Sequence, residues 1–156
     1  MAARKTAPRK EAPKGLAHID AAAYAVKSEP SVYSFDQLVT DKKSGWEGVR
    51  NFEARNMLRA MKEGDTLLYY HSNEGKELVG IARVVTEAFQ DPTTEDDWSS
   101  IELAPVKRLK RSVGLAEMKE NAILKTMPLV ARGRISVTPV TAEELAEVLR
   151  LADTKL

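Results

Sequence analysis

Two β-rich runs joined by a short glycine-containing connection constrain the fold of this 156-residue chain most strongly. The runs are "GDTLLYYHS" (64–72) and "ELVGIARVVTEAF" (77–89), and the "NEGK" between them is typical of a β-hairpin. Further strands are predicted at "AAAYAVK" (21–27), "SSIELAPVKRL" (99–109) and "GRISVTPV" (133–140). We therefore expect a small sheet of roughly five strands, most of them joined as hairpins.

Helices are predicted between these strands from capping residues and from apolar spacing. Ser34 with Gln37 has the spacing of a capping box and predicts a short helix over 34–41. Asn51 is a candidate N-cap for a helix whose apolar face is formed by Ala54, Met57, Leu58 and Met61. A short helix is expected at 114–122, and a closing helix opened by Thr141 and Glu144. Together the elements predict an α+β fold, with a small curved sheet or open barrel and helices packed around it.

Composition narrows the class of protein further. The chain length suits one domain with a core of its own. There is no cysteine, which excludes disulfides, thiolate zinc sites and cysteine nucleophiles, and two histidines make a His-rich metal site improbable. No Walker loop, dinucleotide fingerprint, nucleophile elbow or zinc-protease motif occurs. No run approaches the ~20 apolar residues of a membrane span, so we expect a soluble, intracellular protein without a cofactor or a metal.

The first residues differ in composition from the rest. "MAARKTAPRKEAPK" holds five of the 24 Lys and Arg residues and one of the 23 acidic residues. Residues 1–18 are therefore predicted to form a disordered basic tail, and 19–156 the folded domain. The tail is a solubilising or cloning-variable segment, a weak sequence-blind tether for nucleic acid, or an organelle address.

Candidate functional residues lie where predicted strands end and on one loop. Trp46, between Gly45 and Gly48, is either a core anchor or a platform for a ligand. Arg50 and Asn51 follow at a predicted helix start, where backbone N–H groups favour an anionic or acceptor-rich ligand.

Polar residues also end two predicted strands. Lys27, Ser28 and Glu29 precede Pro30, and they either close a turn or form a ligand-binding edge. His71 and Ser72 end the strand at 64–72. Two catalytic schemes are conceivable, with His71 as the base for a Ser28 nucleophile or with Glu29 and His71 as an acid–base pair.

Four ordered stretches resemble the EVE domain family: "YAVKSEPSVYSFDQL", "GWEGVRNFEARNML", "GDTLLYYHSNEGKELVGIARV" and "DPTTEDDW". The resemblance runs from about Tyr24 to Leu151 and includes "MPLVARGRISVTPVT". It implies the PUA-like fold, a small curved β-barrel with flanking helices. The family is similar to YTH domains, which read methylated adenine in RNA, and its members are thought to read modified bases, including methylated cytosine in DNA.

The resemblance also implies roles for individual residues. Lys27 and Ser28 match the residues that line the base pocket of YTH domains, and Trp46 matches a tryptophan of the methyl-binding cage. The positions of the family motif around the same pocket are held by Glu29, Arg50, Asn51, His71 and Ser72. Tyr24 stands where members often carry tryptophan, so it is a candidate pocket wall. Arg55 and Arg59 are candidate phosphate contacts.

These observations predict a non-enzymatic module that binds a modified nucleobase in DNA or RNA. The candidate bases are methylated or hydroxymethylated cytosine and methylated adenine. We expect a monomer or weak dimer without membrane association, cytoplasmic in a bacterium and nuclear in a eukaryote. One alternative is an enzyme acting on nucleotides or modified nucleosides through Glu29 and His71. Another is a scaffold whose partner is a protein.

Overall fold

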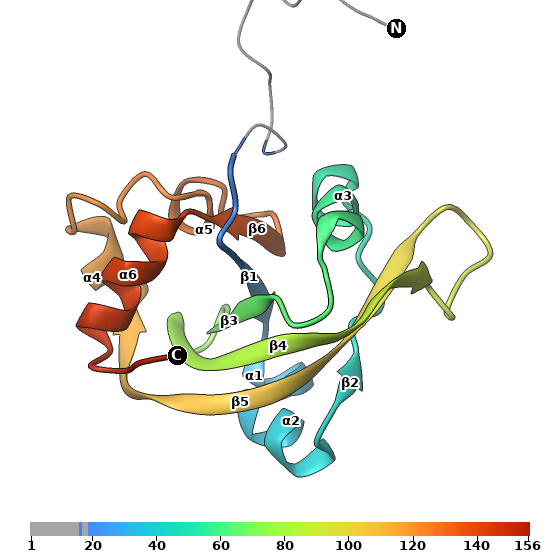
Figure 1. Ribbon diagram of the computed structural model, residues 1–156, viewed down its shortest axis with the longest axis horizontal. Helices are drawn as coiled ribbons and strands as arrows, with labels where there is room; N and C mark the ends of the chain where they lie inside the picture. The colour runs from blue at the N-terminus through green and yellow to red at the C-terminus, as the bar shows by residue number, and fades with distance from the viewer. Residues whose placement is uncertain (1–15, 17–18) are drawn as a thin grey trace, which may run out of the picture.

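The computed structural model describes Leu16 and residues 19–156, which form a curved mixed sheet with short helices around it (Figure 1). The sheet has six strands in the order β2-β5-β4-β3-β1-β6. The strands are β1 (Ala23–Ser28), β2 (Ser44–Gly45), β3 (Thr66–His71), β4 (Glu77–Gln90), β5 (Ser99–Gly114) and β6 (Val137–Val140). The helices are α1 (Pro30–Tyr33), α2 (Phe35–Asp41), α3 (Phe52–Ala60), α4 (Leu115–Lys119), α5 (Pro128–Ala131) and α6 (Ala142–Leu151).

The centre of the sheet contains one parallel pair. β1 pairs in parallel with β3 and antiparallel with β6. A parallel pair needs a crossover connection, and α1, α2, β2 and α3 form it. Because parallel strands end at the same edge of a sheet, the register places Ser28 opposite His71. The crossover therefore brings two polar strand ends together that are far apart in the sequence.

β4 and β5 form a long antiparallel ribbon that crosses the whole molecule (Figure 1). The register between them shifts several times, and such bulges increase strand twist and bend a sheet. Among the described residues, the edge strands β2 and β6 do not pair with each other, so the sheet is open. The α+β class is confirmed, whereas closure into a barrel is not.

Both faces of the central strands are buried. Tyr24 and Val26 of β1 pack into one hydrophobic cluster, whereas Ala23 and Ala25 pack into another on the opposite face. This follows from the alternation of side chains along a strand. The buried residues of α3 join the first cluster, and the buried apolar residues of α6 join the second. On β4, a Cβ at Gly80 would overlap the Phe35 ring, so glycine lets α2 approach the sheet closely.

The predicted helix caps are confirmed. The Gln37 N–H donates to the Ser34 hydroxyl at 3.0 Å, and the Ala54 N–H donates to Asn51 Oδ1 at 2.9 Å. Thr141 and Glu144 form a complete capping box at the start of α6. The sequence did not predict β2, α1 or α5, which have only two, four and four residues. Elements this short have no periodicity of their own and form because their neighbours pack on them.

The predicted basic tail, residues 1–18, lies outside the described residues except for Leu16. That side chain is buried in the first cluster, and its N–H donates to Glu53 Oε2 at 3.0 Å. None of the helices in the described part of the chain has the length and apolarity needed to cross a membrane.

Candidate functional site

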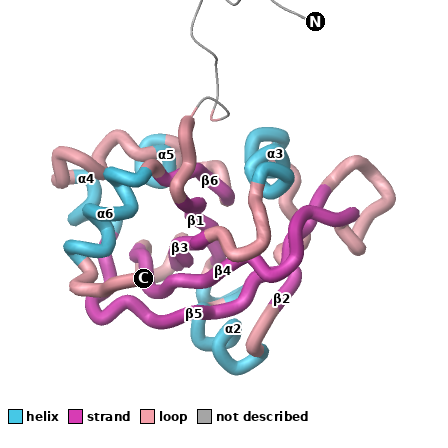
Figure 2. The backbone as a smooth tube through the Cα atoms, viewed as in Figure 1, coloured by secondary structure: helices cyan, strands magenta, loops and turns pink. Residues whose placement is uncertain are grey.

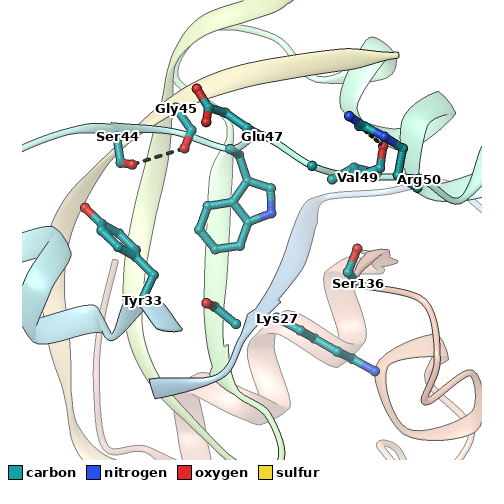
Figure 3. Close-up of a pocket in the computed structure, with 11 residues that line it drawn as sticks. Lys27, Tyr33, Ser44, Gly45, Glu47, Val49, Arg50 and Ser136 are labelled. Carbon is teal, nitrogen blue, oxygen red and sulfur yellow. Dashed lines mark hydrogen bonds between the residues drawn. The ribbon is translucent and has the colours of Figure 1, made fainter. Parts of the chain in front are cut away.

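A pocket of about 410 Å³ opens where β1 ends, between α1, β2 and the loop that follows β2 (Figure 3). Its lining comes from four places in the chain: Lys27 and Ser28, Tyr33, residues 44–50, and Ser136. Residues 46–51 form the loop between β2 and α3 (Figure 2). We call this cavity the tryptophan pocket, because Trp46 is its largest lining side chain.

Trp46 is both a core residue and a pocket wall. Its side chain is 9% exposed, and its ring packs edge-on against Tyr69, with the centroids 5.6 Å apart. The backbone N–H of Trp46 donates to the Ile101 carbonyl at 2.8 Å, which continues the pairing of β2 with β5. Tyr33, in a different part of the lining, is fixed by its hydroxyl, which donates to Asp41 Oδ2 at 2.7 Å. The pocket therefore has two aromatic residues held in place by the fold.

Lys27 stands at the border of the pocket. Its ammonium donates to the Gly133 carbonyl at 2.9 Å, and burial lowers its pKa. In Figure 3 the Lys27 side chain runs away from Tyr33, with its nitrogen beyond Ser136. Lys27 therefore borders this pocket, whereas its charged end lies on the other side.

A buried carboxylate shapes the loop that carries Trp46. Asp91 is fully buried, and Oδ2 accepts hydrogen bonds from the Gly48 N–H at 2.8 Å and from the Arg50 guanidinium at 3.0 Å. Oδ1 accepts from the N–H and the hydroxyl of Thr93 at 2.7 and 2.6 Å. Burial by itself raises the pKa of Asp91, but these hydrogen bonds outweigh it and hold the pKa well below its usual range. Gly48 has φ +82°, a conformation that favours glycine.

The arginines near the pocket are already engaged. The Arg50 guanidinium also donates to the Thr93 hydroxyl at 3.0 Å and lies 5.6 Å from the centroid of the Trp98 ring. Trp98 stacks on Phe52, whose side chain is 65% exposed, with centroids 5.2 Å apart. Arg55 and Arg59, the predicted phosphate contacts, both pair with the exposed carboxylate of Asp97, at 3.4 and 2.5 Å. Phosphate binding by these two would have to compete with Asp97.

The structure brings four of the predicted ligand residues together around the tryptophan pocket: Lys27, Ser28, Trp46 and Arg50. The others lie elsewhere. Tyr24 is buried in the first core cluster, and Asn51 caps α3. Glu29 is exposed and accepts a hydrogen bond of 3.3 Å from the Asn73 amide, while Ser72 lines a neighbouring cavity.

His71 sits behind the pocket rather than in its lining. Its Nε2 accepts a hydrogen bond of 3.1 Å from the Phe35 N–H, and desolvation lowers its pKa, so the ring is held neutral. A nitrogen that accepts from a backbone N–H has no lone pair left to take a substrate proton. The geometry therefore gives His71 a structural task at the start of α2. The described residues contain no cluster of His, Asp or Glu that could hold a metal.

Sequence reasoning missed several lining residues, namely Tyr33, Ser44, Glu47 and Ser136, as well as the supporting Asp91. Tyr33 and Asp91 both lie within the stretches that resemble the family, which was the one signal available. Ser136 precedes β6, more than 100 residues from Lys27, and only the pairing of β1 with β6 brings it to the pocket.

Residues 22–151 match the EVE domain in a comparison with known protein families. The chain is 38% identical over 134 residues to thymocyte nuclear protein 1 of Gallus gallus, which covers 70% of this chain and 55% of that protein. The chain thus spans about half the length of this relative.

Two solved structures are similar along nearly the whole described chain. One is a protein from Rhodopseudomonas palustris, at 44% identity and a TM-score of 0.81, covering 85% of this chain and 93% of that one. The other is the human THYN1 protein in complex with 5-methylcytosine containing DNA, at 32% identity and a TM-score of 0.77, covering 86% of this chain and 99% of that one. With 22–151 matched and the fold shared at these identities, the chain belongs to the EVE domain family.

Proposed function

We propose that this protein binds DNA that carries a modified nucleobase and holds that base in the tryptophan pocket. The observation that carries the proposal is the pocket itself, about 410 Å³ in volume and lined by Trp46 and Tyr33. Its volume falls in the range of ~300–1,000 Å³ that is usual for small-molecule sites. The complex of the related human protein with 5-methylcytosine containing DNA makes that base the first ligand to test.

The free-energy cost of extruding a base from the duplex and the gain from stacking it in the pocket are similar in size. Extruding one nucleotide from a duplex costs a few kcal/mol. Stacking a base on an aromatic side chain contributes ~1–3 kcal/mol. Trp46, with Tyr33 as a second aromatic wall, can therefore roughly offset the cost of extrusion.

Selectivity requires polar groups as well as aromatic ones. Burying one methyl group contributes only ~0.8 kcal/mol, or about a fourfold preference. A mismatched polar edge costs more, because each buried group left unpaired costs ~1–3 kcal/mol. Glu47 lines the pocket, is exposed, and has no ion pair with another described residue. Its carboxylate can accept a hydrogen bond from the exocyclic amino group of cytosine. The hydroxyls of Ser28 and Ser136 can form hydrogen bonds with the other polar atoms of the base.

The two tryptophans of the chain offer a matched test. Trp46 lines the pocket, whereas Trp98 packs on Phe52 away from its lining. In a Trp98→Phe protein, Trp46 is the single fluorescent tryptophan and reports directly on a base stacked beside it. We expect this fluorescence to change and then reach a plateau as 5-methylcytosine DNA is added. The unmodified oligonucleotide should cause the same change only at higher concentration.

Binding should also be compared between Tyr33→Ala and the control Phe52→Ala, which removes an exposed ring outside the pocket lining. Tyr33→Ala should weaken binding by at least tenfold if one base–aromatic contact of ~1.4 kcal/mol or more is lost. The oligonucleotide panel contains hydroxymethylcytosine, methyladenine and RNA versions, which identifies the preferred ligand. Equal affinity of all oligonucleotides, or equal loss in both variants, would refute a base pocket at Trp46.

A further inference from the structure

A second cavity, of about 260 Å³, lies on the other side of Lys27 from the tryptophan pocket. Its lining includes three lysines, Lys27, Lys76 and Lys119, beside the ring of Tyr70 and apolar side chains such as Leu129. No carboxylate residue is part of that lining among the described residues. We call this cavity the lysine pocket.

The charged end of Lys27 belongs to the lysine pocket. Its ammonium bonds to the Gly133 carbonyl and lies 5.9 Å from the centroid of the Tyr70 ring, and both residues line this second cavity. Lys27 thus borders both cavities, with its nitrogen on the side of the lysine pocket (Figure 3).

The positive charge in the lysine pocket is not neutralised by the described part of the protein. None of its three lysines forms an ion pair with a described carboxylate. Two acidic side chains next to lining residues have other hydrogen-bond partners: Glu29 accepts from the Asn73 amide, and Glu77, which follows Lys76 in the chain, accepts from the Ser112 hydroxyl. Lys27 is half-buried, whereas Lys76 and Lys119 are exposed. A half-buried ammonium such as that of Lys27 is unfavourable without a counter-charge, and a bound anion would relieve this.

Two other basic cavities in the described part of the chain contain an acidic or ion-paired group. The cavity beside α6 contains several basic side chains, but Asp153 is part of its lining. In the cavity beside Asn51, one of the two arginines, Arg132, is paired with Glu53 at 2.5 Å. The lysine pocket combines a concave volume, three lysines without ion pairs to described carboxylates, and a lining without acidic residues.

The fold holds two of these lysines at defined positions. Lys76 ends the turn between β3 and β4, with φ +50°, and its carbonyl accepts from the Leu115 N–H at 2.8 Å. That contact ties the turn to the start of α4, and Lys119 is the last residue of this five-residue helix. The distance between Lys76 and Lys119 is thus set by backbone contacts rather than by a flexible loop.

We propose that the lysine pocket is a phosphate-binding site, and that it takes one phosphate group of a nucleic acid or of a mononucleotide. Because Lys27 borders both cavities, a phosphate here lies next to a base in the tryptophan pocket. If the phosphate belongs to the DNA backbone, the inference rests on the proposed function. If the phosphate belongs to a free nucleotide, the inference is independent of the proposed function.

Inorganic phosphate tests the site without DNA. We would titrate phosphate into the ¹⁵N-labelled full chain and follow the backbone amide signals by NMR. Shifts are expected at Lys76, Leu115 and Gly133. They should disappear in K76Q/K119Q and persist in the control K62Q/K110Q, which removes the same charge from two exposed lysines outside the pocket. Absence of these shifts in the wild-type chain, or equal shifts in the two double variants, overturns the proposal.

Two further titrations identify the source of the phosphate. If it belongs to DNA, K76Q/K119Q should lower the affinity for 5-methylcytosine DNA by roughly tenfold and reduce the slope of log K against log[salt] by about 0.9 per lost duplex phosphate contact. An uncharged methylphosphonate linkage beside the modified base should then have the same effect on the wild-type chain. If it belongs to a mononucleotide, cytidine monophosphate should shift the same amides while DNA affinity is unchanged in K76Q/K119Q.

The outcomes separate the two proposals of function. A chain that binds phosphate in the lysine pocket but no DNA would refute base reading and leave the phosphate site standing. A chain that binds 5-methylcytosine DNA through Trp46, without a phosphate response at Lys76 and Lys119, would refute the phosphate site alone.

Discussion

Two aspartates on the loop between β4 and β5 bind arginines that lie just before α3 or within it, and their surroundings differ sharply. Asp91 has a side chain that is 0% exposed, and it binds Arg50 together with the Gly48 and Thr93 N–H groups. Asp97 is 80% exposed and binds Arg55 and Arg59 at the surface. Both belong to residues 91–98, the loop between β4 and β5 that Figure 2 draws in pink.

The comparison shows that ion pairs between aspartate and arginine in one loop contribute differently to stability when one is buried and the other is exposed. When a buried carboxylate or its partners are removed, several desolvated groups remain unpaired. An exposed pair is surrounded by water and salt, and its loss is compensated by hydration. Asp91 therefore fixes the loop that carries Trp46, whereas Asp97 holds surface side chains whose order the pocket does not require.

The largest effect is expected from Asp91→Ala. It leaves the Gly48 and Thr93 N–H groups and the Arg50 guanidinium without their acceptor, so the free energy of unfolding should fall by ~3–5 kcal/mol. Urea denaturation followed by circular dichroism measures this value. In the fraction that stays folded, affinity for 5-methylcytosine DNA should also fall, because the loop of residues 46–50 loses its support. A variant with unchanged stability would show that the hydrogen bonds to Asp91 do not hold the loop.

A smaller effect is expected from pH, and it has a definite sign. The pKa of Asp91 is lower in the folded chain than in the unfolded one, so the carboxylate stabilises the fold above the unfolded value of ~3.9. This contribution is lost as the pH falls from there through the folded pKa. The stability difference between wild type and Asp91→Asn, from urea titrations between pH 7 and pH 2, should therefore shrink below about pH 4. A difference that stays constant over this range would mean that Asp91 does not titrate with folding.

The smallest effect is expected from Asp97→Ala. Arg55 and Arg59 lose a surface partner but remain hydrated, so the denaturation midpoint should hardly move at low salt and not at all in 0.5 M NaCl, since a Debye length of only ~4 Å screens exposed pairs. Binding of DNA should be unchanged, or somewhat stronger because both arginines become available to phosphates. A loss of stability similar to that of Asp91→Ala would remove the distinction between the two aspartates.

Short-range features of the fold were predictable from the sequence. The caps formed by Ser34, Asn51 and Thr141 join groups within three residues of one another, and the hairpin of β3 and β4 is closed by a five-residue connection. Features of the site were predictable only in part. Lys27, Ser28, Trp46 and Arg50 line one pocket, but Asn51 is used as a cap, His71 bonds to the Phe35 N–H, and Tyr24 lies in the core.

The sequence by itself determined the α+β class, the helix starts and the family, because capping and periodicity act over a few residues and the family motifs are contiguous. The tertiary structure decided which polar residues meet. The parallel pairing of β1 with β3 brings Ser28 to His71, and a hydrogen bond across 43 residues joins Gly48 to Asp91. Such contacts depend on the free energy of the whole core and on closing long loops, and no local pattern encodes them. The division of Lys27 between two pockets arises in the same way.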